Sequence, residues 1–185
     1  MPAKPPTSVC LFCGAREARD PCHAAAAGEI GAGLARAGVR LVYGAGDRGL
    51  MGRAAAAARA AGGATLGVIP AHLLGREARS ASPSMIVTET MHERKKVMFM
   101  NAEAIVVLPG GAGTLDEFFE VLTWAQLGLH AKPIVLINVA GAWDALVALI
   151  GSVIDGGYAD RSLARHFRVV ADAPAALAAL GLDRT

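Results

Sequence analysis

The sequence predicts an α/β protein built on a doubly wound parallel sheet with helices on both faces. Short apolar segments alternate with alanine-rich segments along the 185 residues, and this alternation is the pattern that produces parallel sheets. Two apolar segments, I-V-V-L and P-I-V-L-I, contain no polar residue, so both of their faces are expected to be buried. The length fits a single domain spanning 1–185, in which we expect 1–7 to be a flexible tail.

Each strand is expected where a short apolar run stands between polar or glycine-containing turns. The first is S-V-C-L-F, the second ends in the L-V-Y that precedes a glycine loop, and the fifth is the A-I-V-V-L that precedes another. In chain order, the expected strands are 8–12, 39–43, 65–69, 85–87, 104–108, 133–137 and 167–170.

Longer segments between these strands favour helices because they are rich in alanine, leucine and charged residues. Alternation of this kind is typical of a Rossmann-like doubly wound sheet, in which ligands bind at the carboxyl ends of the strands. A site is therefore expected in the loops that follow strands. The expected helices are 21–37, 50–61, 91–101, 115–127, 143–154 and 173–180.

The composition argues against a nucleic-acid partner and a membrane partner. The formal net charge is +2, and the basic residues are scattered apart from Arg94, Lys95 and Lys96, which is not the pattern of a nucleic-acid-binding surface. The alanine run between Arg53 and Arg59 is too short for a membrane span, which needs about 18 apolar residues. The segment M-P-A-K-P-P-T-S has no apolar stretch of signal-peptide length, so we expect a cytoplasmic protein.

The cysteines and histidines do not form a recognisable metal or redox motif. Cys10 and Cys13 have C-x-x-C spacing, but they flank the apolar Leu11 and Phe12 of a predicted strand, where residues at an odd separation point to opposite faces. We therefore expect them, together with Cys22, to be buried free thiols. The five histidines show no ligand-like spacing, and no metal or other cofactor is expected.

The first glycine loop is G-A-G-D-R-G, residues 44–49, directly after the second expected strand. By its letters it matches the G-x-G-x-x-G motif of dinucleotide-binding proteins. It follows the second strand rather than the first, however, and no Asp or Glu stands about 20 residues later to bind a ribose. It is either a tight turn with close helix packing or, in the interpretation we prefer, a turn whose backbone amides approach a smaller ligand.

The second glycine loop, P-G-G-A-G-T-L-D-E, stands between the fifth strand and the next helix. Gly110, Gly111 and Gly113 permit close backbone approach, and the exposed amides of the following helix attract an anion. No lysine-containing Walker motif is present, so a monophosphate fits better than a triphosphate with magnesium. Thr114 and Glu117 also have the T-x-x-E spacing of a capping box, and spacing alone does not separate a helix cap from a catalytic carboxylate.

A further motif, M-H-E-R-K-K-V-M, precedes the strand that leads into this loop. Arg94 and Lys95 within it would ordinarily be solvated surface charges. Together with P-G-G-A-G-T-L-D-E and F-E-V-L-T-W-A-Q-L-G-L-H-A-K-P, however, the motif resembles the LONELY GUY family of cytokinin riboside 5'-monophosphate phosphoribohydrolases, whose older members were often mislabelled lysine decarboxylases. The resemblance extends from F-C-G through V-Y-G-A-G-D-R-G-L-M-G and G-V-I-P to the helix after Trp143.

The resemblance implies a homodimer and a set of site residues. In the family, the nucleotide site includes the arginine and lysine of M-H-x-R-K, the glycine loop with its closing glutamate, a glutamate after G-V-I-P and the threonine of L-T-W-A-Q. The implied catalytic residues are Arg94 and Glu117. Departures such as Ala15, where serine is usual, and Ala45, where glycine is commoner, bear on substrate preference. The implied substrate-binding residues are Glu77, Arg94, Lys95, Gly110, Gly111, Ala112, Gly113, Thr114, Leu115, Asp116, Glu117 and Thr123.

These residues suit the hydrolysis of an N-glycosidic bond. The reaction builds positive charge on the sugar, which a fixed carboxylate stabilises, while a phosphate bound at the loop orients the ribose. We expect cleavage of AMP or a cytokinin nucleotide to free base and ribose 5-phosphate, which would activate the cytokinin without any cofactor. Two other functions stay open on the sequence: a non-catalytic nucleotide or cofactor carrier, and an NAD-dependent oxidoreductase.

Overall fold

The structure is a computed structural model that describes residues 4–75 and 84–183. Its strands fall within one residue of the expected positions, because each contains a short apolar run that stands between polar or glycine-containing turns. The strands are β1 (Ser8–Phe12), β2 (Arg40–Tyr43), β3 (Thr65–Pro70), β4 (Met85–Thr88), β5 (Ala104–Val107), β6 (Ile134–Ile137) and β7 (Arg168–Val170).

The helices also agree with the expected ranges to within one residue, except that the fourth begins three residues earlier than expected. Short 3-10 turns at Ala71–Leu73, Val139–Gly141 and Arg161–Arg165 were not anticipated, because single turns leave no periodic pattern in a sequence. The α-helices are α1 (Pro21–Arg36), α2 (Gly49–Ala60), α3 (Met91–Met100), α4 (Ala112–Gln126), α5 (Asp144–Asp155) and α6 (Ala173–Ala179).

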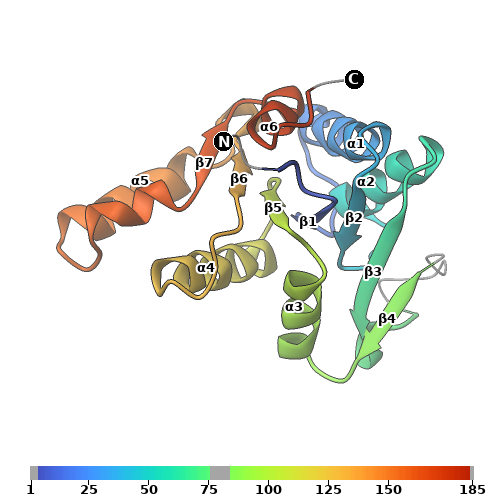
Figure 1. Cartoon of the computed structure of the whole chain (residues 1–185), viewed down its shortest axis with the longest axis horizontal. Helices are drawn as coiled ribbons and strands as arrows, with labels where there is room; N and C mark the ends of the chain where they lie inside the picture. Colours follow the sequence, from blue (N-terminus) through green and yellow to red (C-terminus); the bar gives the residue numbers. More distant parts are fainter. Residues whose placement is uncertain (1–3, 76–83, 184–185) are drawn as a thin grey trace.

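The described strands form one seven-stranded sheet in the order β4-β3-β2-β1-β5-β6-β7, and every neighbouring pair in it is parallel (Figure 1). Helices α1, α2 and α6 contribute to the apolar cluster on one face, and α3, α4 and α5 contribute to the cluster on the other. The predicted doubly wound fold is thereby confirmed. Cys10 and Cys13 belong to different clusters, as their odd separation predicts, and both are buried free thiols, whereas Cys22 is only partly buried.

The sheet changes direction between β1 and β5. The chain proceeds outward from β1 through β2 and β3 to β4, then returns to the middle and adds β5 on the other side of β1. The loops after β1 and β5 therefore leave the sheet toward opposite faces, and a crevice forms between them. One hydrogen bond joins the two loops, in which the Gly14 amide donates to the Pro109 carbonyl at 3.0 Å.

The end of the expected N-terminal tail is attached to the sheet. The amide and hydroxyl of Thr7 donate to the Glu103 carboxylate at 2.7 and 3.1 Å, and the Thr7 carbonyl accepts from the Arg40 amide. The first three residues of that tail lie outside the described part of the chain. Within the described part, none of the helices has the length and apolar character that crossing a bilayer requires.

Candidate active site

A cavity of about 460 Å³ occupies the crevice between the loops that follow β1 and β5. We call it the glycine-loop cavity. One wall is the start of α4, with residues of the second glycine loop, and another is α3, with Arg94 and Lys95. The remaining walls come from Gly14, Ala15 and Arg16 after β1 and from single side chains of neighbouring segments. The two motifs that the sequence singles out therefore meet in one place.

The N-terminus of α4 has no side-chain cap. Gly111 is the N-cap residue, in an extended conformation, and no side chain accepts a hydrogen bond from the first turn. The amides of Ala112, Gly113 and Thr114 thus lack intrahelical partners, and the helix dipole adds positive potential at the same point. All three residues line the glycine-loop cavity, so the helix offers an anion-binding end to that space.

Glu117 is not part of a helix cap. Because α4 begins at Ala112, Thr114 is the third residue of the helix rather than its N-cap, and the capping-box interpretation of T-x-x-E at this position is wrong. The Glu117 side chain instead lies in the wall of the glycine-loop cavity with only 7% of its surface exposed. Burial raises the pKa of Glu117 to about 7, although the nearby Arg94 guanidinium opposes that shift.

Arg94 is buried, and the interpretation of it as a solvated charge is also wrong. Only 5% of its surface is exposed. Its Nε donates to the Val68 carbonyl at 3.1 Å, and its Nη2 donates to the Gly44 carbonyl at 2.8 Å. The Nη1 nitrogen lies 4.0 Å from the Met91 sulfur, a long and weak contact. One of these carbonyls is in β3 and the other is just after β2. Their hydrogen bonds satisfy two of the guanidinium donors, offset part of the cost of burying the charge, and fix the direction of the side chain.

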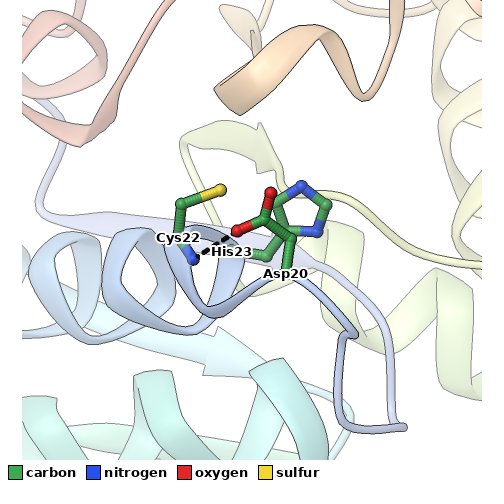
Figure 2. A group of neighbouring side chains, drawn as sticks. All are labelled: Asp20, Cys22 and His23. Atoms are coloured by element: carbon green, nitrogen blue, oxygen red, sulfur yellow. Dashed lines mark hydrogen bonds between the residues drawn. The ribbon is translucent and has the colours of Figure 1, made fainter.

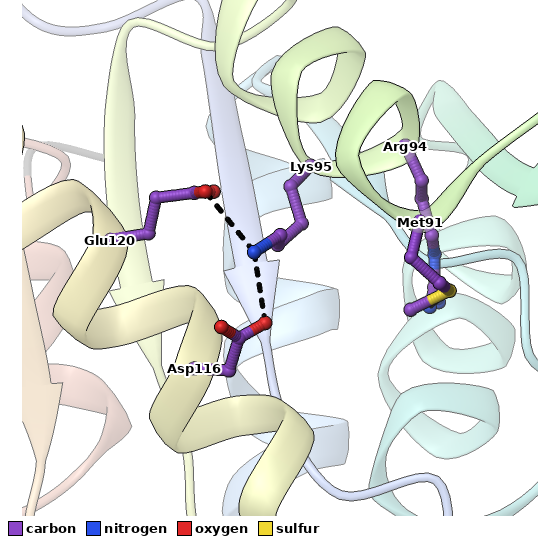
Figure 3. A network of polar contacts seen from close by, with 5 residues as sticks. All are labelled: Met91, Arg94, Lys95, Asp116 and Glu120. Carbon is purple, nitrogen blue, oxygen red and sulfur yellow. Dashed lines mark hydrogen bonds and ion pairs between the residues drawn. The ribbon is translucent and has the colours of Figure 1, made fainter.

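Lys95 is buried beside Arg94 but has different partners. Its Nζ contacts the Asp116 carboxylate at 2.9 Å and the Glu120 carboxylate at 3.1 Å, so that one ammonium joins α3 to two successive turns of α4 (Figure 3). Burial by itself lowers the pKa of Lys95, but the hydrogen bonds to Asp116 and Glu120 outweigh it and raise that pKa above its ordinary value. Lys95 is therefore charged and already paired.

A capping box does exist, at the start of α3. The Thr90 hydroxyl accepts from the Glu93 amide at 3.1 Å, and the Glu93 carboxylate accepts from the Thr90 amide at 3.3 Å and the Glu89 amide at 2.8 Å. T-M-H-E has the same T-x-x-E spacing as T-L-D-E, but it was not identified as a capping box from the sequence. This cap defines the first turn of the helix that holds Arg94 and Lys95.

The chain is similar to proteins of one family over most of its length. The family described as possible lysine decarboxylase matches residues 51–180. A probable cytokinin riboside 5'-monophosphate phosphoribohydrolase of rice (Oryza sativa subsp. japonica) is 43% identical over 167 residues, which cover 90% of this chain and 74% of that protein. The chain belongs to the LONELY GUY family. A second member, a cytokinin riboside 5'-monophosphate phosphoribohydrolase of Arabidopsis thaliana, is 40% identical over 88% of this chain and 72% of its own length.

Solved structures with this fold include proteins named for carrying or binding the molybdenum cofactor. The molybdenum cofactor carrier protein of Chlamydomonas reinhardtii matches with a TM-score of 0.70 and 26% identity over 97% of both chains. The molybdenum cofactor binding protein of the bacterium Rippkaea orientalis matches with a TM-score of 0.71 and 19% identity over the full length of both. The Rossmann-like fold expected of a LONELY GUY protein is therefore also found in proteins named for binding or carrying the molybdenum cofactor.

The other site residues that the family resemblance implies are not all in the glycine-loop cavity. Gly110 lines a second cavity of about 410 Å³, on the side of the loop where Arg16, Arg19 and Trp143 lie. Leu115 packs against the apolar cluster under α4, and Thr123 is exposed near the far end of that helix. Glu77 falls outside the described residues.

Several residues of the glycine-loop cavity were not predicted from the sequence. Gly14, Ala15 and Arg16 follow β1, and Met51 comes from the first turn of α2. The order of strands in the sheet points to these residues, because β1 pairs with β5. This pairing brings the loop after β1 next to the glycine loop. The letters F-C-G mark this loop only as part of the family resemblance.

One group of side chains in the described structure has the donor types of a metal site. Asp20, Cys22 and His23, at the start of α1, have ligand atoms within 4.8 Å of one another (Figure 2), which the spacing of the histidines alone did not reveal. The Asp20 carboxylate accepts a hydrogen bond from the Cys22 amide at 2.9 Å and is the N-cap of α1. Capping thus accounts for the position of this carboxylate, and the group does not border the glycine-loop cavity.

Proposed function

We propose that the protein hydrolyses the N-glycosidic bond of a nucleoside 5'-monophosphate, releasing free base and ribose 5-phosphate. The observation that carries the proposal is the position of Glu117, whose buried carboxyl group shares a cavity with the uncapped N-terminus of α4. An anionic phosphate and a cationic sugar are the two charges that this reaction presents to a site. The named activity of the rice and Arabidopsis relatives supports the same reaction.

The substrate is AMP or a cytokinin riboside 5'-monophosphate, and the release of the base activates the cytokinin. Its phosphate binds the amides of Ala112, Gly113 and Thr114, where the helix dipole favours negative charge. Binding at this remote group orients the ribose against Glu117 and uses binding energy for the reacting centre. A volume of about 460 Å³ falls within the range of small-molecule sites.

In the chemical step, the oxygen of water bonds to the anomeric carbon as the bond from that carbon to the base nitrogen breaks. The electron pair of the broken bond leaves with the base, which takes up a proton. Positive charge develops on the ribose ring, and the carboxylate of Glu117 either stabilises this charge or accepts a proton from the attacking water. The reaction needs no cofactor.

Arg94 and Lys95 have separate roles in this proposal. Two of the five guanidinium N–H groups of Arg94 donate to backbone carbonyls, which leaves others to hold the substrate or to assist the departing base. The ammonium of Lys95 is engaged by Asp116 and Glu120, so it fixes α3 against α4 rather than neutralising a phosphate.

The enzyme acts as a homodimer, and the surface that supports this proposal lies over α3 and α4. Met100, Leu127 and Leu129 are each more than 60% exposed there, beside a cavity of about 390 Å³ lined by Phe99 and Trp124. We call this the α3–α4 surface. Apolar side chains that cluster on a surface mark contact sites, and a two-fold dimer buries the same patch on both subunits.

A non-catalytic carrier is the alternative, and the structural similarity to the molybdenum cofactor carrier protein of Chlamydomonas reinhardtii favours it. One experiment separates the two. Pure protein is incubated with AMP, with an isopentenyladenosine monophosphate and with the corresponding nucleosides, and the released base and ribose 5-phosphate are measured. We expect release from the monophosphates and much slower release from the nucleosides. Tight binding of nucleotide without product would favour the carrier, and equal rates for nucleotide and nucleoside would contradict the phosphate anchor.

A further inference from the structure

The first glycine loop is next to Arg94, although the proposed reaction gives it no role. Gly44 is the first glycine of G-A-G-D-R-G and follows β2 directly. Its carbonyl accepts the 2.8 Å hydrogen bond from Nη2 of Arg94, while the Val68 carbonyl of β3 accepts from Nε of the same side chain. The guanidinium is thus held at two points by the carboxyl-end region of two adjacent strands.

The space beside Gly44 is filled by the same guanidinium. A Cβ atom at position 44 would lie 2.8 Å from Cζ of Arg94 and would overlap its Nη2 nitrogen. It would also approach the terminal methyl of Met51 at 3.2 Å. The side chain of Arg94 therefore occupies the volume that any residue other than glycine would need for its own side chain.

The backbone at Gly44 does not itself require glycine. The described residues with positive φ include Ala45, at 60°, but not Gly44. Two later glycines of the same stretch differ, because a Cβ at Gly49 or Gly52 would meet the backbone of Ala15 and Arg16 or of Asp47. Backbone cannot yield cheaply, whereas the end of an arginine side chain can move. A methyl group at position 44 would thus displace the guanidinium of Arg94 and leave the chain fold in place.

We propose that Gly44 is a positioning residue for Arg94, and that its missing side chain and its carbonyl together set where the guanidinium stands in the glycine-loop cavity. The proposal rests on the proposed function, in which Arg94 contacts the nucleotide. It also assigns the G-A-G-D-R-G loop a purpose: at its first glycine, the loop shapes the site through Arg94 instead of binding a dinucleotide.

The test is a double-mutant cycle on hydrolysis of AMP, using Gly44→Ala, Arg94→Ala and the double variant. Misplacing a catalytic group by about 1 Å costs on the order of 10²-fold, so Gly44→Ala should lower kcat/KM by about that factor while keeping the parent's circular dichroism spectrum. In the Arg94→Ala background, the same change should have less than about a twofold effect, because residues that act through one another are not additive. Gly151→Ala, where a Cβ meets nothing within 4 Å, is the matched control and should match the parent.

A crystal structure of Gly44→Ala provides a readout that does not depend on turnover. The guanidinium of Arg94 should have left the Gly44 carbonyl; if both carbonyl contacts persist, the inference is wrong. It is equally overturned if Gly44→Ala hydrolyses AMP at the parent rate, or if it loses activity to the same extent with and without Arg94. A parent protein that releases no base would instead refute the proposed function, and the crystal structure alone would then decide the role of Gly44.

Discussion

At the scale of single residues, Glu117 and Arg94 influence one another through a shared, poorly solvated space. Burial raises the pKa of Glu117 to about 7, and the Arg94 guanidinium acts in the opposite direction by favouring the carboxylate. Near neutral pH, the carboxyl group is therefore divided between its neutral and charged forms. The proposed reaction needs the charged form. Arg94, which is proposed to contact the substrate, therefore also favours the form of Glu117 that the reaction needs.

Replacing Glu117 by glutamine tests the proposed role of its charge. Glutamine has nearly the same shape and can still form hydrogen bonds, but it cannot stabilise a cationic sugar. We expect a folded variant whose turnover with AMP falls by about 10²–10⁴-fold, the range for a lost acid–base group. Glu120→Gln is the control, because Glu120 contacts Lys95 but does not line the glycine-loop cavity; its turnover should fall much less. Near-parental turnover in Glu117→Gln would rule out the proposed mechanism.

The same substitution should change how stability depends on pH. The ordinary pKa of a glutamate is 4.5, and that of Glu117 in the folded protein is about 7, so the folded state binds the proton more tightly than the unfolded state does. The contribution of Glu117 is thus most favourable below pH 4.5 and is lost as the pH rises through 7. Glu117→Gln should therefore have a higher Tm than the parent at pH 8 and nearly the same Tm at pH 4.5.

Glu120→Gln provides a control of opposite sign for this pH experiment. Glu120 contacts the buried ammonium of Lys95 at 3.1 Å, so its replacement removes one of the two carboxylates that compensate that charge. We expect its Tm at pH 8 to lie below that of the parent. Melting curves in which Glu117→Gln is also destabilised at pH 8 would show that the Glu117 carboxylate has stabilising partners that outweigh its burial.

At the scale of elements, the sequence predicts where the helices and strands are but not how each one begins. T-M-H-E at 90–93 and T-L-D-E at 114–117 carry the same letters, yet only the first forms a capping box. The difference lies in the backbone: α4 is already helical at Ala112, so Thr114 is too far inside the helix to cap it. Gly113 has a low helix propensity, yet it lies within the first turn of α4.

The capping box on α3 should be important for the stability of the site. Thr90→Ala removes the hydroxyl that accepts from the Glu93 amide, and a lost cap of this kind costs about 0.5–2 kcal/mol. We expect the free energy of unfolding, measured with urea, to fall within that range. Thr123→Ala is the matched control, because Thr123 is an exposed threonine near the C-terminal end of α4, far from any N-cap position, and its replacement should cause little change. Equal stability of Thr90→Ala and the parent would mean that water replaces the cap without cost.

At the scale of the whole molecule, the site depends on contacts between segments that are distant in sequence. The alternation of strands and helices predicts a doubly wound sheet, but it does not predict that β5 pairs with β1. That pairing brings Arg16 to the glycine loop. The carbonyls that hold Arg94 come from β3 and from the residue just after β2. A single sequence does not contain these juxtapositions. From the residues alone, Arg94 would be expected at the surface, and only the family resemblance places it in the site.

The proposed dimer makes a prediction that concerns the whole molecule. Met100 and Leu129 on the α3–α4 surface expose more than two thirds of their area, and a two-fold interface there would bury each of them in both subunits. Because burying an unpaired carboxylate is costly, Met100→Glu combined with Leu129→Glu should convert the dimer to a monomer, as measured by light scattering during size-exclusion chromatography. Tyr158→Glu is the control: Tyr158 is 87% exposed after α5 and does not line the cavity of the α3–α4 surface, so its replacement should leave the mass unchanged. If the double variant keeps the parent's dimeric mass, the subunits associate through another face.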